Sequence, residues 1–133
     1  MGQPAARKDD SVVGIDIHVV MVPAPSGAVP TPLPHPFSGT ITGGTIASVK
    51  IGGAEAAVVG SQATNQPPHL PTPPGTSFQK PPSNKGKVDA GSSTVKIGGK
   101  AAARMGDAVK TCNDPADADT SAIVSGESSV MIG

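Results

Sequence analysis

The chain has 133 residues and a mass of 13.0 kDa, which is the size of a single domain. Its 10 Lys and Arg balance its 10 Asp and Glu, and this zero net charge argues against nucleic acid as a partner. With 17 Gly and 15 Pro, long helices are nearly excluded. The 14 Val and 8 Ile far outnumber the 2 Leu, a bias that is typical of strands, so the composition predicts an all-β protein with a thin core.

The first strand is predicted around residues 15–22. Ile15 and Ile17 alternate with Asp16 and His18, which puts His18 on the opposite face from the isoleucines. This longest apolar stretch is too short to span a membrane, and the N-terminus lacks the pattern of a secretory signal. We therefore expect synthesis and assembly in the cytoplasm, with any export by another route.

Two segments of the chain are rich in proline. Residues 23–36 follow the first predicted strand directly, and residues 66–82 lie further along the chain. Because proline cannot donate to a β-ladder, both segments are predicted to be stiff loops. Residues 76–91, rich in Ser, Lys and Gly, could equally be an ordered loop or a disordered linker.

A repeat divides the rest of the chain. The sequence VKIGG at residues 49–53 returns at residues 95–99, and a third related strand, VMIG, occupies residues 130–133. A second element, PAARKDD at residues 4–10, resembles AAARMGD at residues 101–107. Alternating Val and Ile followed by Gly-Gly indicate a strand and a tight turn. The repeats therefore predict short β-hairpins in series.

The chain has four side chains that could act as soft metal ligands: His18, His35, His69 and Cys112. A tetrahedral zinc ion takes four ligands. Neighbouring prolines stiffen the backbone at His35 and His69, which favours a fixed ligand geometry. The spacing, however, matches no short metal signature, and a lone loop histidine is usually a surface residue. The residues by themselves leave both interpretations open. If all four bind, the site is closed and the zinc is structural.

No motif of an enzyme is present: the sequence lacks His-Glu-x-x-His, Gly-x-Ser-x-Gly and a phosphate-binding glycine loop. We therefore expect no enzymatic activity. Two alternatives stay open. One is a zinc-dependent hydrolase with three His ligands and Cys112 elsewhere, and the other is a Pro/Gly-rich adaptor that folds on its partner.

The motifs together resemble the PAAR-repeat family. The residues that carry the resemblance are Pro4-Ala5-Ala6-Arg7, its second copy at residues 101–107, the Val-x-Ile-Gly strands, and three His plus one Cys in the family's order. The resemblance implies a conical β-hairpin protein that caps the trimeric VgrG-like spike of a contractile injection machine, such as type VI secretion or a phage-tail-like particle. It also implies a structural zinc near the vertex, held by His18, His35, His69 and Cys112.

Further expectations follow from this resemblance. Residues 1–133 would form one PAAR domain without an appended effector domain, although effector proteins are further partners that the family implies. The target membrane would be contacted mechanically, and sheath contraction would deliver the tip outside the cell or into a target cell. In the second repeat, Val58 and Ser61 replace the Arg and Asp of the motif, so this copy is expected to pack differently.

The base of the cone is expected to bind the spike. Three hairpin-like repeats in one chain can approximate threefold symmetry, which a single chain needs in order to cap a trimer. The side chains predicted to lie in this contact are Val49, Ile51, Val95, Ile97, Val130 and Ile132.

Overall fold

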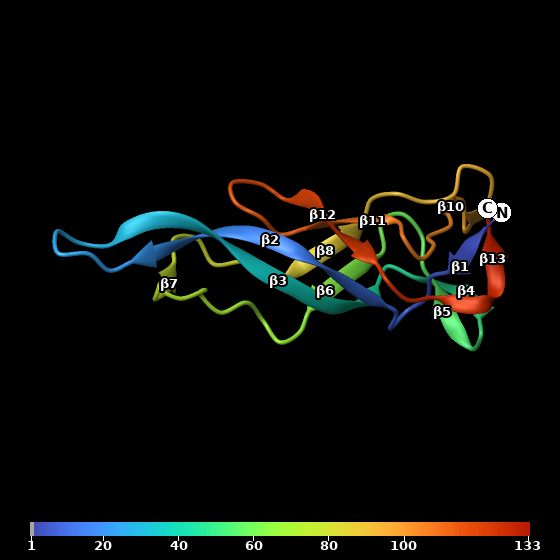
Figure 1. Ribbon diagram of the computed structural model, residues 1–133. Helices are drawn as coiled ribbons and strands as arrows, with labels where there is room; N and C mark the ends of the chain where they lie inside the picture. The colour runs from blue at the N-terminus through green and yellow to red at the C-terminus, as the bar shows by residue number, and fades with distance from the viewer. Residues whose placement is uncertain (1) are drawn as a thin grey trace.

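The computed structural model describes residues 2–133, which form an elongated body with a wide end and a narrow end (Figure 1). Within these residues there is no helix, and accordingly none that is long and apolar enough to cross a membrane. In chain order the strands are β1 (Gln3–Ala5), β2 (Ser11–Val22), β3 (Val29–Gly43), β4 (Ile46–Ile51), β5 (Ala54–Ala56), β6 (Gln62–Asn65), β7 (Ser77–Phe78), β8 (Lys85–Val88), β9 (Lys96–Ile97), β10 (Lys100–Ala101), β11 (Ala108–Thr111), β12 (Ala118–Ile123) and β13 (Glu127–Ile132).

Seven antiparallel strands make the largest sheet, in the order β12-β11-β8-β6-β3-β2-β7. Because β12 also pairs with β2, the strands from β12 to β2 close on themselves like a small barrel. Beyond the barrel, β2 and β3 continue as a long hairpin that forms the narrow end, with β7 beside it (Figure 1). The prediction of an all-β cone is confirmed.

The main hydrophobic core is small. Its bulkiest members are Phe37, Ile41 and Ile123, all almost fully buried. Four of its ten residues are alanines, which bury little apolar area. The core is therefore thin, as the composition predicts. A bound metal ion would add to the folding stability that this core provides.

Three short two-stranded units gather at the wide end. β4 and β5 are joined through Gly52 and Gly53, with φ of 56° and 86°, and β9 and β10 through Gly98 and Gly99, with φ of 59° and 81°. Glycine adopts these positive angles at no steric cost, so the Gly-Gly pairs fix two tight hairpins. The third unit pairs β1 with β13, so both chain ends lie at the wide end (Figure 1). The hairpins predicted from the two VKIGG copies are confirmed.

Three alanines join the repeats at the centre of the wide end. The Ala6 N–H donates to the Ala103 carbonyl, the Ala103 N–H to the Ala57 carbonyl, and the Ala57 N–H to the Ala6 carbonyl, each over 3.0 Å. Because this ring closes after three equivalent steps, a pseudo-threefold axis relates the repeats. The three alanines are fully enclosed, with at most 1% exposure. The predicted pseudo-three-fold base is confirmed.

Each of the three repeats continues into the same turn. The Arg104 N–H donates to Asp107 Oδ2 over 2.7 Å, and the first repeat makes the equivalent bond. In the second repeat the Val58 N–H donates to Ser61 Oγ over 3.0 Å. A serine hydroxyl accepts the bond that a carboxylate accepts elsewhere, so the turn is kept. The expectation that this copy packs differently is wrong for its backbone. It differs in lacking the ion pair that joins Arg104 to Asp107 over 2.8 Å.

The prediction of a loop over residues 23–36 is wrong for residues 29–36, which form the first half of β3. Prolines occupy every second position from residue 30 to residue 36, and they alternate with residues whose N–H and C=O groups point toward β2. In an antiparallel ladder every second residue directs its N–H away from the neighbouring strand, so a proline there removes no bond. On its other side, β3 pairs with β6 only from Gly39 onward, which leaves the proline-bearing half as an edge.

The second proline-rich segment, residues 66–82, is a loop as predicted and contains only the two-residue strand β7. Of the two alternatives for residues 76–91, the structure has the ordered one. This stretch includes β8, which lies between β6 and β11 in the barrel.

Candidate metal centre

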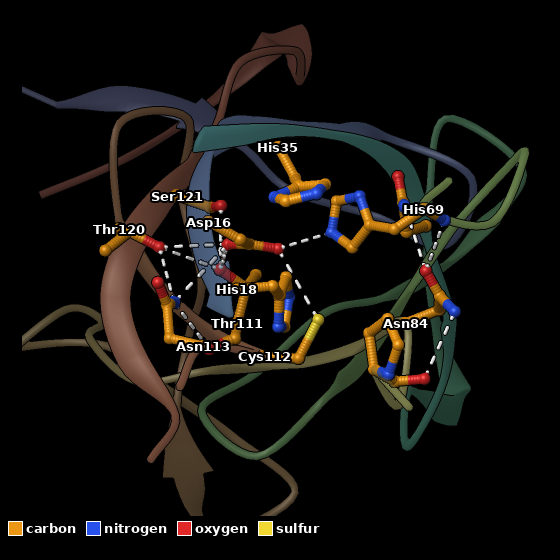
Figure 2. Close-up of polar contacts among 12 residues, drawn as sticks. Asp16, His18, His35, His69, Asn84, Thr111, Cys112, Asn113, Thr120 and Ser121 are labelled. Carbon is orange, nitrogen blue, oxygen red and sulfur yellow. Dashed lines mark hydrogen bonds and ion pairs between the residues drawn. The ribbon is translucent and has the colours of Figure 1, made fainter. Parts of the chain in front are cut away.

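A cluster of buried polar side chains lies where β2 and β3 meet the proline-rich loop and the segment after β11 (Figure 2). β2 contributes Asp16 and His18, which are alternate residues on one face of the strand. β3 contributes His35, which pairs directly opposite Asp16. His69 comes from the loop, and Cys112 follows β11. The fold thus brings together residues that are far apart in the sequence.

Four of these side chains form a tight group. Asp16, His18, His69 and Cys112 each present a ligand atom, and these atoms all lie within 4.8 Å of one another. His69 Nε2 is 2.8 Å from Asp16 Oδ2, and Cys112 Sγ is 3.5 Å from the same oxygen. Nitrogen, oxygen and sulfur donors at such spacing suit a divalent metal ion with four ligands.

Asp16 is the member of the group that sequence reasoning missed. The signal was its position two residues before His18, which places an ionisable side chain on the inward face of the same strand. Its carboxylate is fully buried. Oδ1 accepts hydrogen bonds from the hydroxyls of Thr111, over 2.5 Å, and Thr120, over 3.1 Å. With Oδ1 held in this way, Oδ2 faces the group.

His18 has unmet hydrogen-bonding capacity. Both ring nitrogens are buried without a hydrogen-bond partner in the described residues, and the nearest acidic atom, Asp114 Oδ2, is 3.5 Å from Nδ1. Burial lowers the pKa of His18 below its usual 6.5, which keeps the ring neutral and leaves one nitrogen with a free lone pair. Buried polar atoms in native proteins are almost always satisfied, and a metal ion would satisfy this one.

His35 lies beside the group and outside it. The centroid of its ring is 5.5 Å from that of His18 and 5.6 Å from that of His69. Its Nδ1 lies 2.8 Å from the Leu33 carbonyl, and its Nε2 accepts a hydrogen bond from the Thr72 N–H over 3.1 Å. Three of the four ligands expected from the sequence are therefore in the tight group, and the fourth has backbone partners at both nitrogens.

The segment after β11 is bound to the free edge of β2. Asn113 Oδ1 accepts a hydrogen bond from the Ile17 N–H over 2.6 Å, and Asp114 Oδ2 accepts one from the Val19 N–H over 2.8 Å. These bonds fix the position of Cys112 relative to His18. Asp114, one residue further along, is thus part of this attachment.

The loop that carries His69 is held in a similar way, because Asn84 Oδ1 accepts a hydrogen bond from the His69 backbone N–H over 2.8 Å. The two phenylalanines of the chain flank the histidines. The centroid of the Phe78 ring is 5.3 Å from that of His35, and the centroid of Phe37 is 6.3 Å from that of His69. The imidazoles are thus set in an apolar wall that is continuous with the core through Phe37.

The buried acidic groups of the cluster, Asp16 and Cys112, favour a bound cation. Burial, and then the neighbouring Asp16, raise the pKa of the Cys112 thiol to about 11. Within residues 2–133 the ion-pair partner of Asp16 is His69, and neither Lys nor Arg approaches it. A buried carboxylate is costly without a positive partner. The donor set therefore fits a divalent metal ion, which would also displace the thiol proton.

The residues expected to bind the spike lie in or beside β4, β9 and β13 at the wide end. Ile51 and Ile132 are buried in a second hydrophobic cluster, together with alanines of β1 and β5, while Val49, Val95 and Ile97 pack partly against it. Val130 is 37% exposed and its neighbour Met131 is 56% exposed. Much of the expected contact surface is thus used within the chain, and the outward face includes Met131.

Fold and site together define a small all-β protein with a pseudo-threefold base and a candidate metal centre. The family model of the PAAR motif matches residues 79–133, which include the second Ala-Ala-Arg copy, Cys112 and the strands from β8 to β13. The match confirms the resemblance to PAAR-repeat proteins within these residues. No curated protein matches the chain.

Proposed function

We propose that this protein caps the trimeric VgrG-like spike of a contractile injection machine, such as a type VI secretion system, and serves as its membrane-piercing tip. Assembly would take place in the cytoplasm, and sheath contraction would carry the tip outward or into a target cell. The chain would act mechanically, since the proposed role makes and breaks no covalent bond. Effector proteins that ride on the tip are further partners under this proposal.

The observation that carries the proposal is the ring of hydrogen bonds among Ala6, Ala57 and Ala103. A trimer offers three identical surfaces around its axis, and one chain can meet all three equally only if it repeats a similar surface three times. The three hairpin-like units around this ring supply such a repeat. The narrow β2–β3 hairpin projects from the opposite end (Figure 1), as a piercing tip requires.

We further propose that the metal is zinc and that its role is structural. His18, His69 and Cys112 would hold it, with a fourth donor from Asp16 or His35. Bound zinc would cross-link β2, the loop and the segment after β11, and so add to the stability that the small main core provides. Structural zinc binds small domains with an apparent free energy of roughly 10–16 kcal/mol at the 1 M standard state. The stabilisation that results depends on how far the free zinc concentration exceeds the Kd.

Two features favour this role over the zinc hydrolase alternative. Cys112 Sγ lies within the group of donor atoms, so four protein ligands are available and no coordination position is left for a reactive water. The group is also buried, with at most 8% exposure of any of its four residues, whereas a catalytic metal needs a position that substrate and water can reach. The closed barrel and its buried core form within the single chain, which argues against an adaptor that folds only on its partner.

The proposal is tested by placing a charge on the base. Met131→Glu puts a carboxylate on the exposed face of β13, while Leu70→Glu does the same at a 79% exposed site in the proline-rich loop, away from the base. We expect Met131→Glu to weaken binding to a purified trimeric spike protein at least tenfold with an unchanged melting temperature. Leu70→Glu should leave binding unchanged. Equal affinities for both variants would contradict the proposal.

A further inference from the structure

We propose that Asp16, in place of His35, supplies the fourth ligand, so that the metal is held by one carboxylate oxygen, two imidazoles and one thiolate. This inference rests on the metal centre of the proposed function. Its ligands would come from Asp16, His18, His69 and Cys112, the group whose donor atoms lie within 4.8 Å of one another. The contacts of Asp16 Oδ2 with His69 Nε2 and Cys112 Sγ make these the ligand atoms that we assign.

The first argument is the orientation of the Asp16 carboxylate (Figure 2). Oδ1 receives hydrogen bonds from Thr111, Thr120 and, over 3.4 Å, the amide of Asn113. Oδ2 is directed to His69 Nε2 and Cys112 Sγ. Carboxylates that bind a metal through one oxygen commonly have the other oxygen fixed by such neighbouring donors. The neighbours of Asp16 thus prepare Oδ2 to bind.

The second argument is the state of His35. A neutral imidazole has one N–H and one lone pair. With the Nδ1–H donated to the Leu33 carbonyl, the lone pair is on Nε2, and it is occupied by the Thr72 N–H. To bind a metal, His35 would have to give up one of these bonds and leave a backbone group unpaired. His18, in contrast, has no hydrogen-bond partner to lose.

The third argument is charge. Asp16 is 0% exposed, and without a metal its one ion-pair partner in the described part of the chain is the imidazole of His69. With the carboxylate and thiolate both bound, two negative charges neutralise a divalent cation inside the protein. Direct contact makes this neutralisation strongest, because Coulomb attraction grows as the distance falls. His35 is then a packing residue, set against Phe78 and tied to the loop through Thr72.

The ligand set can be counted directly by NMR on the full chain loaded with ¹¹³Cd²⁺ and labelled with ¹⁵N at histidine. Scalar coupling between cadmium and a ring nitrogen marks each bound imidazole. We expect coupling at two histidines, His18 and His69, with Nε2 as the coupled atom of His69 and none at His35. Coupling at three histidines, or at His69 Nδ1, would overturn the inference. A chain that takes up no cadmium and no zinc would instead contradict the metal centre itself.

Two near-isosteric variants provide a second test, read as zinc content per folded chain and as zinc affinity in a chelator competition. Asp16→Asn keeps the shape of the side chain and removes its charge, and we expect its zinc affinity to fall at least a hundredfold. For His35→Gln we expect less than a fivefold change. The opposite ranking would overturn the inference. The count of coupled histidines in the unmodified chain decides the question even if Asp16→Asn fails to fold.

Discussion

The substitution Cys112→Ser removes the sulfur ligand and changes the shape of the side chain very little. The thiol is buried, so an alanine replacement would leave a cavity and remove the polar contact, whereas a hydroxyl is only slightly smaller than the thiol and can keep the polar contact with Asp16. The decrease in the free energy of unfolding of this variant then measures how much the bound metal stabilises the fold. Free zinc at a thousand times its Kd stabilises a folded protein by about 4 kcal/mol. For a chain of this length, each kcal/mol corresponds to roughly 3–5 °C in Tm, which gives a decrease of roughly 12–20 °C.

Calorimetric melting with and without a chelator measures this effect. The unmodified protein should lose roughly the same 12–20 °C on chelation and regain it when zinc is restored, while Cys112→Ser should melt at the lower temperature in both conditions. Val88→Ala is the matched control, because Val88 is buried in the main core and is not part of the metal group. It should lower Tm through a loss of about 1–3 kcal/mol and keep the full response to chelator. A Cys112→Ser protein that retains one zinc per chain and melts like the unmodified chain would refute the reasoning.

Two further predictions concern proton release and the pseudo-threefold axis. Because the pKa of the Cys112 thiol is raised to about 11, the thiol is protonated at pH 7 and must lose its proton to bind zinc, whereas the lowered pKa of His18 means that its ring is already neutral. We therefore expect zinc affinity to increase about tenfold per pH unit from pH 7 to 9, with about one proton released in calorimetric titrations in buffers of different ionisation enthalpy; a pH-independent affinity would argue against the thiolate as a ligand. On the axis, Ala57→Val places two extra methyl groups in a closed space and should cost about 1–3 kcal/mol in urea unfolding, while Ala47→Val on the exposed side of β4 should be nearly neutral. Equal stabilities for these two variants would show that the axis is not tightly packed.

The wide end of the protein could be predicted from the sequence because its structure is determined locally. Each VKIGG copy contains both a strand and the Gly-Gly pair that turns it, so the hairpins follow from a few adjacent residues. The repetition of the motif indicated the pseudo-threefold arrangement. The turn at Val58 could not be predicted from the motif alone. There the hydroxyl of Ser61 accepts the hydrogen bond that an aspartate carboxylate accepts in the other two repeats.

The proline segment and the metal group were harder to predict because they depend on distant parts of the chain. Whether a proline breaks a ladder depends on which edge of its strand is free, and β6 leaves the first half of β3 uncovered. Similarly, Asp16 lies among isoleucines, and the partners that give it a role, His69 and Cys112, are 53 and 96 residues away. The sequence indicated the nitrogen and sulfur donors but not the carboxylate among them.

The stoichiometry of the complex with a purified trimeric spike protein tests the central claim most directly. Mass photometry of a titration would count chains per spike without any label. One pseudo-threefold chain occupying the spike axis predicts one copy per three spike subunits, and the count should not rise when the chain is in excess. Three copies per trimer, or no complex at all, would contradict the account.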